Sequence, residues 1–293
     1  MTLFLQTLIG GLLAGVMYSL VAIGFVLIYK ASGVFNYAQG SILLFGALSF
    51  VTLTEHGVPF WLALPITGAA IVIVSILIER LVLRPLINRD PLTLFMATLG
   101  LSFVIDGLVQ LFLGSDVHML DLGINDVPVA IGGISVSQFD LVASGVAVTL
   151  VLVLSVVFSK TRMGISLRAV ANDTLAAQSV GIQLPHIWRI VWSVAGLVSL
   201  VAGLLWGARQ GVQYSLSLIA LKALPVLIIG GFSSVNGAIV AGLLVGATES
   251  VADIYIGPLV NGSVSTWFAY ILSVGFLLIR PTGLFGERAI ERV

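Results

Sequence analysis

Three acidic residues stand inside long apolar segments of this sequence, where a charge is costly. Asp106 is spaced four residues apart from further polar residues, so that they share one helical face: Thr98, Ser102 and Gln110. Glu249 and Asp253 are also four residues apart, and like charges at that spacing repel each other. Ionisable residues in such segments indicate ion or proton pathways by default. The pattern indicates either an ion-coupled transporter or polar faces that contact a neighbouring helix or a water-filled cavity.

Enzyme and metal chemistry find no support in the residue types. The sequence has no cysteine, and its three histidines, His56, His118 and His186, are far apart. No nucleophile–base pair and no metal-ligand spacing occurs within the apolar segments. The glycine-rich phosphate loop that ends in Gly-Lys is absent, as is any Gly-Lys pair. We therefore expect no enzyme activity and no cofactor bound by this chain. Any ATP that drives it must be hydrolysed on another chain.

Two amide–glycine pairs, Gln39-Gly40 and Asn236-Gly237, offer a different chemistry. An amide donates and accepts hydrogen bonds without bringing a charge into an apolar segment. Glycine permits close backbone approach or an unwound helix. These pairs either line a path for a zwitterion or hold helices together, as small and polar residues commonly do in membranes.

Both pairs belong to weakly similar stretches of the chain. Phe35-x3-Gln39-Gly40-x-Ile42 parallels Phe232-x3-Asn236-Gly237-x-Ile239, and Gly15-Val-x-Tyr-Ser-Leu20 recurs as Gly211-Val-x-Tyr-Ser-Leu216. Transporters often place a binding site between internal repeats, near broken helices. The alternative is chance matching in a chain rich in Gly, Ser and Leu.

The elements that carry these residues must be membrane spans. Hydrophobic residues make up 59% of the 293 residues and charged residues 9%, whereas soluble domains average about 25% charged residues. A soluble fold of this composition would expose large apolar patches, and a bilayer removes that problem. The composition predicts an all-α integral membrane protein that forms a single transmembrane domain, residues 1–293.

Because a span needs about 20 mostly apolar residues, we expect a polytopic bundle of eight or nine transmembrane helices. The candidate spans are 3–29, 38–54, 60–82, 92–113, 139–159, 186–208, 218–232, 235–256 and 264–280. The segment 218–232 is short, carries Pro225 and ends at Gly230-Gly231. We expect a broken or re-entrant helix there. The opening apolar run has no basic residue before Lys30, so it is predicted to be a span rather than a cleaved signal peptide.

The charges of the loops predict an orientation, because Lys and Arg favour the cytoplasmic side. Three basic segments should lie inside: the turn with Arg80, Arg84 and Arg89, the loop with Lys160, Arg162 and Arg168, and the tail with Arg280, Arg288 and Arg292. The loop 114–138 has no Lys or Arg and should lie outside; its acidic residues are Asp116, Asp121 and Asp126. With nine spans, the N-terminus is then outside and the C-terminus cytoplasmic. Only Arg209 and Lys222, which flank segment 218–232, break the pattern.

The basic loop 160–185 contains signals for a short helix. Asn172 or Asp173 is a ready N-cap for a helix over 174–180. Gly181 suits the left-handed residue that ends a helix, and Pro185 is expected to prevent the helix from resuming. Helices this short are marginal in water. The loop is therefore either a docking site for a partner protein or an ordinary basic inside loop.

Several motifs resemble those of a transporter family. Ala176-Ala177-x3-Gly181 followed by Ile182-x-Leu184-Pro185 is similar to a shortened coupling loop of ABC importer permeases, with Leu175 where an acidic residue is usual. Further stretches resemble LivH-type permeases of branched-chain amino acid importers (the LivH/LivM family). These are Gly33-Val-Phe-Asn-Tyr-Ala-Gln-Gly40, Met163-Gly-Ile-Ser-Leu-Arg-Ala-Val-Ala-Asn-Asp173, Gly230-Gly-Phe-Ser-Ser-Val-Asn-Gly237 and Arg280-Pro-Thr-Gly-Leu-Phe-Gly286. The matches cover nearly the whole chain.

The resemblance implies a permease subunit in a bacterial cytoplasmic membrane that translocates leucine, isoleucine and valine, with urea or short amides as alternative substrates. Its implied partners are ABC ATPase subunits, a second permease chain (LivM-like or a copy of itself) and an extracytoplasmic binding protein. The implied ATPase-coupling residues are Gly164, Arg168, Asp173, Ala176, Ala177, Gly181, Leu184 and Pro185. The candidate substrate-pathway residues are Asn36, Gln39, Gly40, Asp106, Gly231, Asn236 and Gly237. An ion-coupled secondary transporter that uses Asp106, Glu249 and Asp253 remains the other hypothesis.

Overall fold

The computed structural model is helical and describes residues 2–87, 89–114, 116–124, 127–131, 133–260, 263–265 and 267–286. Within this part, six helices are long and apolar enough to cross a membrane: Thr2–Ser32, Phe60–Leu86, Pro91–Phe112, Gln138–Lys160, Leu184–Gln210 and Val235–Val260. Shorter apolar stretches are Gln39–Glu55, Tyr214–Gly230 and Phe268–Ile279. Each predicted span overlaps one of these helical stretches. The predicted charges Asp126, Arg288 and Arg292 lie outside the described residues.

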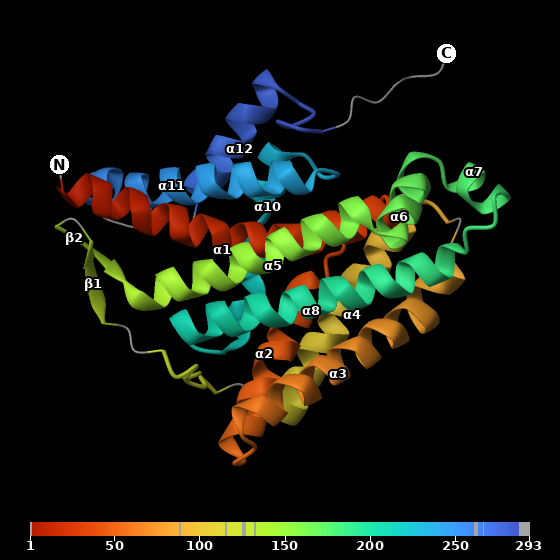
Figure 1. Ribbon diagram of the computed structural model, residues 1–293, viewed down its shortest axis with the longest axis horizontal. Coiled ribbons are helices and arrows are strands. Elements are labelled where there is room, and N and C mark those ends of the chain that lie inside the picture. The colour runs from red at the N-terminus through yellow and green to blue at the C-terminus, as the bar shows by residue number, and fades with distance from the viewer. Residues whose placement is uncertain are drawn as a thin grey trace. The chain divides into compact units, whose positions relative to one another are not determined.

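The elements are labelled in chain order in Figure 1. The long helices are α1 (Thr2–Ser32), α2 (Gln39–Glu55), α3 (Phe60–Ile78), α4 (Pro91–Leu113), α5 (Gln138–Lys160), α8 (Leu184–Gln210) and α11 (Val235–Val260). Shorter helices are α6 (Arg162–Asn172), α7 (Thr174–Ser179), α9 (Ile219–Lys222), α10 (Leu224–Gly230) and α12 (Phe268–Ile279). A π-helical turn η1 (Glu79–Leu83) and the 3₁₀ turns η2 (Arg84–Leu86) and η3 (Tyr214–Leu218) complete the helical elements, beside strands β1 (Pro128–Ile131) and β2 (Ile134–Ser137).

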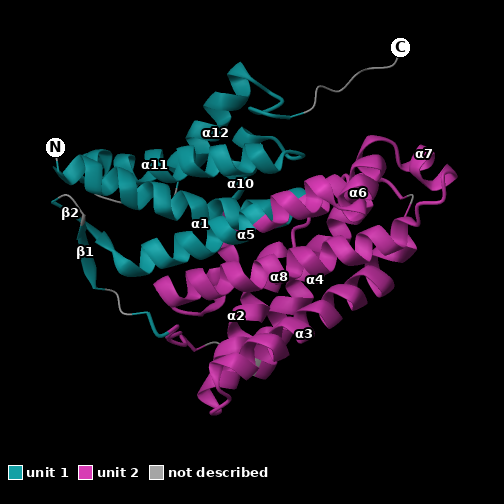
Figure 2. Ribbon diagram, in the orientation of Figure 1, with its two compact units in different colours: residues 1–26, 123–152, 222–293 teal, residues 27–122, 153–221 magenta. Residues whose placement is uncertain are grey.

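The chain forms two compact units, coloured separately in Figure 2. Unit 1 comprises residues 1–26, 123–152 and 222–293, and unit 2 comprises residues 27–122 and 153–221. In unit 1, α10 packs against α11 and α12. In unit 2, α2 is central and packs against α3, α4, α8 and η3, so the residues at its start are surrounded by other helices.

Segment 218–232 is not a continuous helix. It is divided among η3, α9 and α10, and α10 ends at Gly231, whose φ of +96° no other residue type adopts easily. Pro225 lies in the first turn of α10, where its missing N–H costs no hydrogen bond. The sequence signals that marked this segment as doubtful therefore coincide with the observed breaks.

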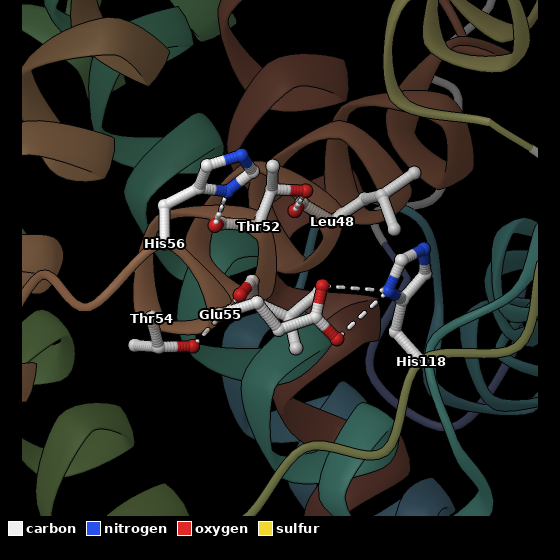
Figure 3. A network of polar contacts seen from close by, with 7 residues as sticks. Leu48, Thr52, Thr54, Glu55, His56 and His118 are labelled. Carbon is white, nitrogen blue, oxygen red and sulfur yellow. Dashed lines mark hydrogen bonds and ion pairs between the residues drawn. The ribbon is translucent and has the colours of Figure 1, made fainter.

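The predicted loop 114–138 contains an antiparallel hairpin, in which β1 pairs with β2 from Pro128↔Ser137 to Ile131↔Ile134. Its first part is attached to unit 2 through His118. The His118 backbone exchanges hydrogen bonds with Val212, and His118 Nδ1 lies 2.9 Å from Glu55 Oε1 at the end of α2, as Figure 3 shows. The histidine thus holds this loop against the ends of α2 and α8.

The turn before α4 is stabilised by a capping carboxylate. Asp90 accepts hydrogen bonds from the Thr93 hydroxyl at 2.7 Å and from the Leu92 N–H at 2.7 Å. These bonds, that from Thr93 first, hold the pKa of the Asp90 carboxyl below its ordinary value. Pro91 occupies the first helical position, so this sequence starts a helix at a defined residue.

Candidate functional site

The amides Asn36 and Gln39 lie together at the start of α2, and each is only 1% exposed. Asn36 Nδ2 donates to Gln39 Oε1 at 3.1 Å, and Gln39 Nε2 donates to Ser199 Oγ on α8 at 2.6 Å. Asn36 Oδ1 also accepts from the Ala38 N–H at 3.1 Å. Buried amides must be hydrogen-bonded, because an unpaired polar group in an apolar interior costs free energy. These groups therefore form an uncharged polar cluster inside unit 2.

Gly40 brings α2 close to the broken segment of unit 2. A Cβ at Gly40 would overlap the carbonyl oxygen of Ser217 in η3 and lie 3.0 Å from the Ala220 side chain. The absence of a side chain is therefore a requirement for this packing.

Asp106 lies on a buried polar stripe of α4. Thr98, Ser102 and Asp106 are buried, whereas Gln110 is exposed. The stripe faces α2 and its preceding loop, because Ser102 Oγ lies 3.0 Å from Ser41 Oγ and the Tyr37 N–H donates to Thr98 Oγ1 at 3.1 Å. Asp106 Oδ1 is buried and has no hydrogen-bond partner among the described residues. This oxygen is therefore a candidate contact for water or substrate.

The second amide–glycine pair lies in unit 1 and is arranged differently. Asn236 is exposed, and Gly237 is buried, where a Cβ would overlap the Gly230 carbonyl oxygen. Gly231 contacts the segment that follows α12: a Cβ there would lie 2.7 Å from the Gly286 nitrogen. The family-like motifs 230–237 and 280–286 therefore pack against each other. Beside this contact, the Leu284 N–H donates to the Ile229 carbonyl oxygen at 2.7 Å.

A close contact between α1 and α11 was missed from the sequence. A Cβ at Gly11 would lie 2.6 Å from the Gly246 carbonyl oxygen, and a Cβ at Gly15 would overlap the Gly242 carbonyl oxygen. The signal was present, because Gly11-x3-Gly15 and Gly242-x3-Gly246 are both the small-x3-small pattern that brings membrane helices together.

The two carboxylates of α11 have different partners. Glu249 lies 3.8 Å from Lys222 Nζ and accepts a long hydrogen bond from Tyr18 at 3.5 Å. Asp253 accepts from the backbone N–H groups of Val264 and Ser265 at 2.8 and 3.0 Å. Lys222, which broke the charge pattern, therefore balances Glu249. No group of three or more His, Asp or Glu side chains in the described part of the chain is placed to hold a metal ion.

The first half of the 160–185 loop is the helix α6, which the sequence reading did not predict. Thr161 caps its start by accepting from the Gly164 N–H at 3.3 Å. A Cβ at Gly164 would overlap the Phe158 carbonyl oxygen, so glycine lets α6 fold back on the end of α5. Arg168 donates to the carbonyls of Phe158 at 2.5 Å and Ser159 at 3.3 Å. It thereby caps the last turn of α5, where a cation is favoured.

The second half matches the expected short helix, α7. Asp173 is its N-cap and accepts from the Ala176 N–H at 2.9 Å, as predicted. Gly181 ends it with φ +89°, and its N–H donates to Gln178 while Ile182 N–H donates to Ala177, which is a Schellman motif. Ala177 is buried and Ala176 is exposed.

One expectation about this loop is wrong. Pro185 does not prevent a helix from resuming; it lies in the first turn of α8, which begins at Leu184. The first turn of a helix needs no N–H from its residues, so proline starts this helix. Leu184 is buried. Only a short turn, residues 180–183, separates α7 from the span α8.

The family model and the known proteins that resemble this chain match it over nearly its whole length. The family model for branched-chain amino acid transport system / permease component matches residues 7–280. The high-affinity branched-chain amino acid transport system permease protein LivH of Escherichia coli K12 is 30% identical, covering 99% of this chain and 98% of that protein. BraD of Pseudomonas aeruginosa is 28% identical with the same coverage. A probable LivH of Methanocaldococcus jannaschii is 30% identical over 91% of this chain and 88% of its own.

Among solved structures, a chain of PsaBC from Streptococcus pneumoniae, determined in complex with a Fab, has a similar fold. The TM-score is 0.50 with 17% sequence identity, and the match covers 94% of this chain and 90% of that one. At this identity the likeness concerns the fold alone.

Proposed function

The chain belongs to the family of permease components of branched-chain amino acid transport systems, and we propose that it translocates leucine, isoleucine and valine in an ATP-driven importer. It is a transport subunit and not an enzyme, and ATP is hydrolysed on partner ATPase subunits. The printed names of its relatives support the choice of substrate, with urea or short amides as the alternative. The importer further requires an extracytoplasmic binding protein and a second permease chain, LivM-like or a copy of this one.

The observation that carries this proposal is the α7 segment. It is a six-residue helix capped at both ends, and the apolar side chains of Leu175 within it and of Val180 directly after it are each 76% exposed. A helix this short is not stable by its own hydrogen bonds, and exposed apolar side chains on a fixed helix favour a protein partner. We assign this surface to the ATPase subunit, with residues 160–185 as the coupling loop of the permease domain 1–293.

In this proposal each coupling residue has a mechanical role. Gly164 and Arg168 hold α6 against the end of α5, while Asp173 and Gly181 fix the length of α7. Ala176 and Ala177 let α7 lie close to its neighbours, and Leu184 and Pro185 start α8. Movement of the ATPase during its cycle would thereby shift α8, whose Ser199 binds Gln39 of the polar cluster.

The passage itself is proposed to use both amide–glycine regions. Asn36, Gln39, Gly40 and Asp106 would form its polar part in unit 2, and Gly231, Asn236 and Gly237 would contribute in unit 1. The internal repeat is best supported at Phe35–Ile42 and Phe232–Ile239, since each stretch follows a glycine with positive φ and enters a helix. The other pair is less alike, because Gly15 lies within α1 and Gly211 ends α8.

The proposed topology has the N-terminus outside, the C-terminus cytoplasmic and nine crossings, with η3, α9 and α10 as one broken or re-entrant element. The distribution of basic residues supports it. Lys222 no longer argues against it, because its charge is balanced by Glu249. The remaining exception, Arg209, lies 5.7 Å from the Trp206 ring, as a cation–π contact.

The experiment reconstitutes the complete importer in liposomes and compares ATP hydrolysis with leucine uptake. Ala177→Trp and Gly181→Val should leave assembly intact but uncouple hydrolysis from uptake, because a tryptophan does not fit at the buried Ala177 and a valine does not adopt the left-handed backbone of Gly181. Gly107→Val is the matched control, since no atom lies within 4 Å of a Cβ there. Normal uptake by the Ala177→Trp and Gly181→Val importers would refute the coupling role.

The ion-coupled alternative receives less support, because Glu249 and Asp253 are both engaged within unit 1. It predicts that the purified chain, without ATPase, moves substrate along an ion gradient in liposomes. The substrate itself is tested by titrating the cognate binding protein with leucine and with urea.

A further inference from the structure

A polar groove lies beside α7 in unit 2. It has a volume of about 390 Å³ and is lined by residues of three elements: Arg84, Gln178, Ile182, Gln183, Leu184, Pro185, His186 and Arg189. Two guanidinium groups and two amides therefore face one opening, and no carboxylate of the described residues lines it. A groove of this kind favours an anionic ligand, and arginine binds carboxylates in a planar, two-point geometry.

A buried carboxylate fixes one of these arginines. Glu79 is completely buried in the π-helical turn η1, and Arg189 Nε lies 3.6 Å from its Oε2. Arg189 itself is 40% exposed and lines the groove. Because a buried charge must be compensated, Glu79 restrains Arg189 at the wall of the groove.

Two acidic residues close in the sequence to the groove residues are bonded to helix starts. Asp173 accepts the Ala176 N–H as the α7 cap, and Asp90 is bonded to Leu92 and Thr93. In contrast, the Arg84 side chain is exposed and makes no hydrogen bond or ion pair with any other described residue. The groove therefore has an uncompensated positive charge, next to the exposed apolar residues of α7.

We propose that this groove receives an acidic side chain of the ATPase subunit, bound by Arg84 and Arg189, while Leu175 and Val180 make the apolar part of the same interface. This inference rests on the proposed function and adds the chemistry of the contact. A protein is favoured over an anionic lipid headgroup because the apolar side chains Leu175 and Val180, each 76% exposed, lie on either side of the groove residue Gln178 in the chain. A mixed apolar and charged surface is also typical of protein interfaces.

The first experiment measures binding of the purified cognate ATPase to the permease complex in nanodiscs. Arg84→Glu should weaken binding roughly tenfold or more, because it replaces a charge-assisted bond by repulsion. Arg89→Glu is the matched control: Arg89 is exposed, lies in the same turn and does not line the groove. The measurement is repeated in zwitterionic lipid and in lipid that contains phosphatidylglycerol.

The second experiment locates the carboxylate. Arg84→Lys places an amine in the groove, and a zero-length carbodiimide should join it to an Asp or Glu of the ATPase, identified by mass spectrometry. Arg89→Lys should give no additional product. Equal binding by Arg84→Glu and Arg89→Glu, or a charge effect seen only in anionic lipid, would overturn the groove assignment while the coupling role stands. Failure of the unmodified complex to bind any ATPase would instead refute the proposed function.

Discussion

Gln39–Gly40 in unit 2 and Asn236–Gly237 in unit 1 are both an amide residue followed by glycine at the start of a helix, yet the two amides have different surroundings. Gln39 is buried and bonded to Asn36 and Ser199, whereas Asn236 is exposed. The two glycines are alike, because each lies against a backbone carbonyl oxygen, that of Ser217 for Gly40 and that of Gly230 for Gly237.

The comparison teaches that the glycine is the shared structural requirement and the amide is not. In unit 2 the amide crosses from α2 to α8 and joins two helices. In unit 1 the helix start is held by another group, since Ser234 Oγ accepts the Gly237 N–H at 3.0 Å. An exposed Asn236 is then free of a packing role, which suits a residue that would meet substrate or a partner chain.

The largest effect is expected at the two glycines. Gly40→Val and Gly237→Val should each lower the free energy of unfolding by about 3 kcal/mol, the upper end of the usual cost of overpacking, because the added carbons meet backbone atoms that cannot move aside. Chemical denaturation of the purified chain in mixed micelles measures the change. Gly107→Val, whose Cβ meets open space, should be close to neutral. A Gly237→Val chain as stable as this control would break the likeness of the two glycines.

A smaller and unequal effect is expected at the amides. Gln39→Leu should cost about 1–3 kcal/mol, because it leaves the Asn36 amide donor without its acceptor in a buried site. Asn236→Leu should stay within about 0.5 kcal/mol, as exposed substitutions commonly do. The same denaturation assay compares them. Equal losses for the two variants would mean that the amides are equivalent and that the contrast drawn above is wrong.

The smallest effects, about 1 kcal/mol each, are expected for Ser199→Ala and Ser234→Ala. Combining each serine substitution with that of the amide in the same unit tests whether the two side chains act together. The double variant Ser199→Ala, Gln39→Leu should lose less free energy of unfolding than the sum of the two single losses, because both substitutions remove the same Gln39–Ser199 hydrogen bond. Ser234→Ala combined with Asn236→Leu should be additive, since no bond joins those side chains among the described residues. Additivity in the first pair would show that the Gln39–Ser199 bond contributes nothing to stability.

Local signals in the sequence were reliable at several positions. Asp173 as a cap, Gly181 as a left-handed residue and the break around Pro225 were predictable because each depends on neighbours a few residues away. The helix α6 was missed because it is stabilised by tertiary contacts with α5, which cannot be inferred from the residues of α6 alone. Arg168 donates to carbonyls at the end of α5, and Gly164 lies against one of them. Pro185 was misjudged because proline both ends and starts helices.

The sequence by itself determined the membrane class, the approximate spans, the short capped helix and, through its motifs, the family. These properties depend on composition, periodicity and turn residues, which are local. Only the tertiary structure decided which polar groups compensate one another: Glu79 with Arg189, Glu249 with Lys222 and Gln39 with Ser199. The partners in these pairs are 27 to 160 positions apart in the sequence. A buried polar group needs a partner at hydrogen-bond distance, and the sequence states the need without saying which distant residue meets it.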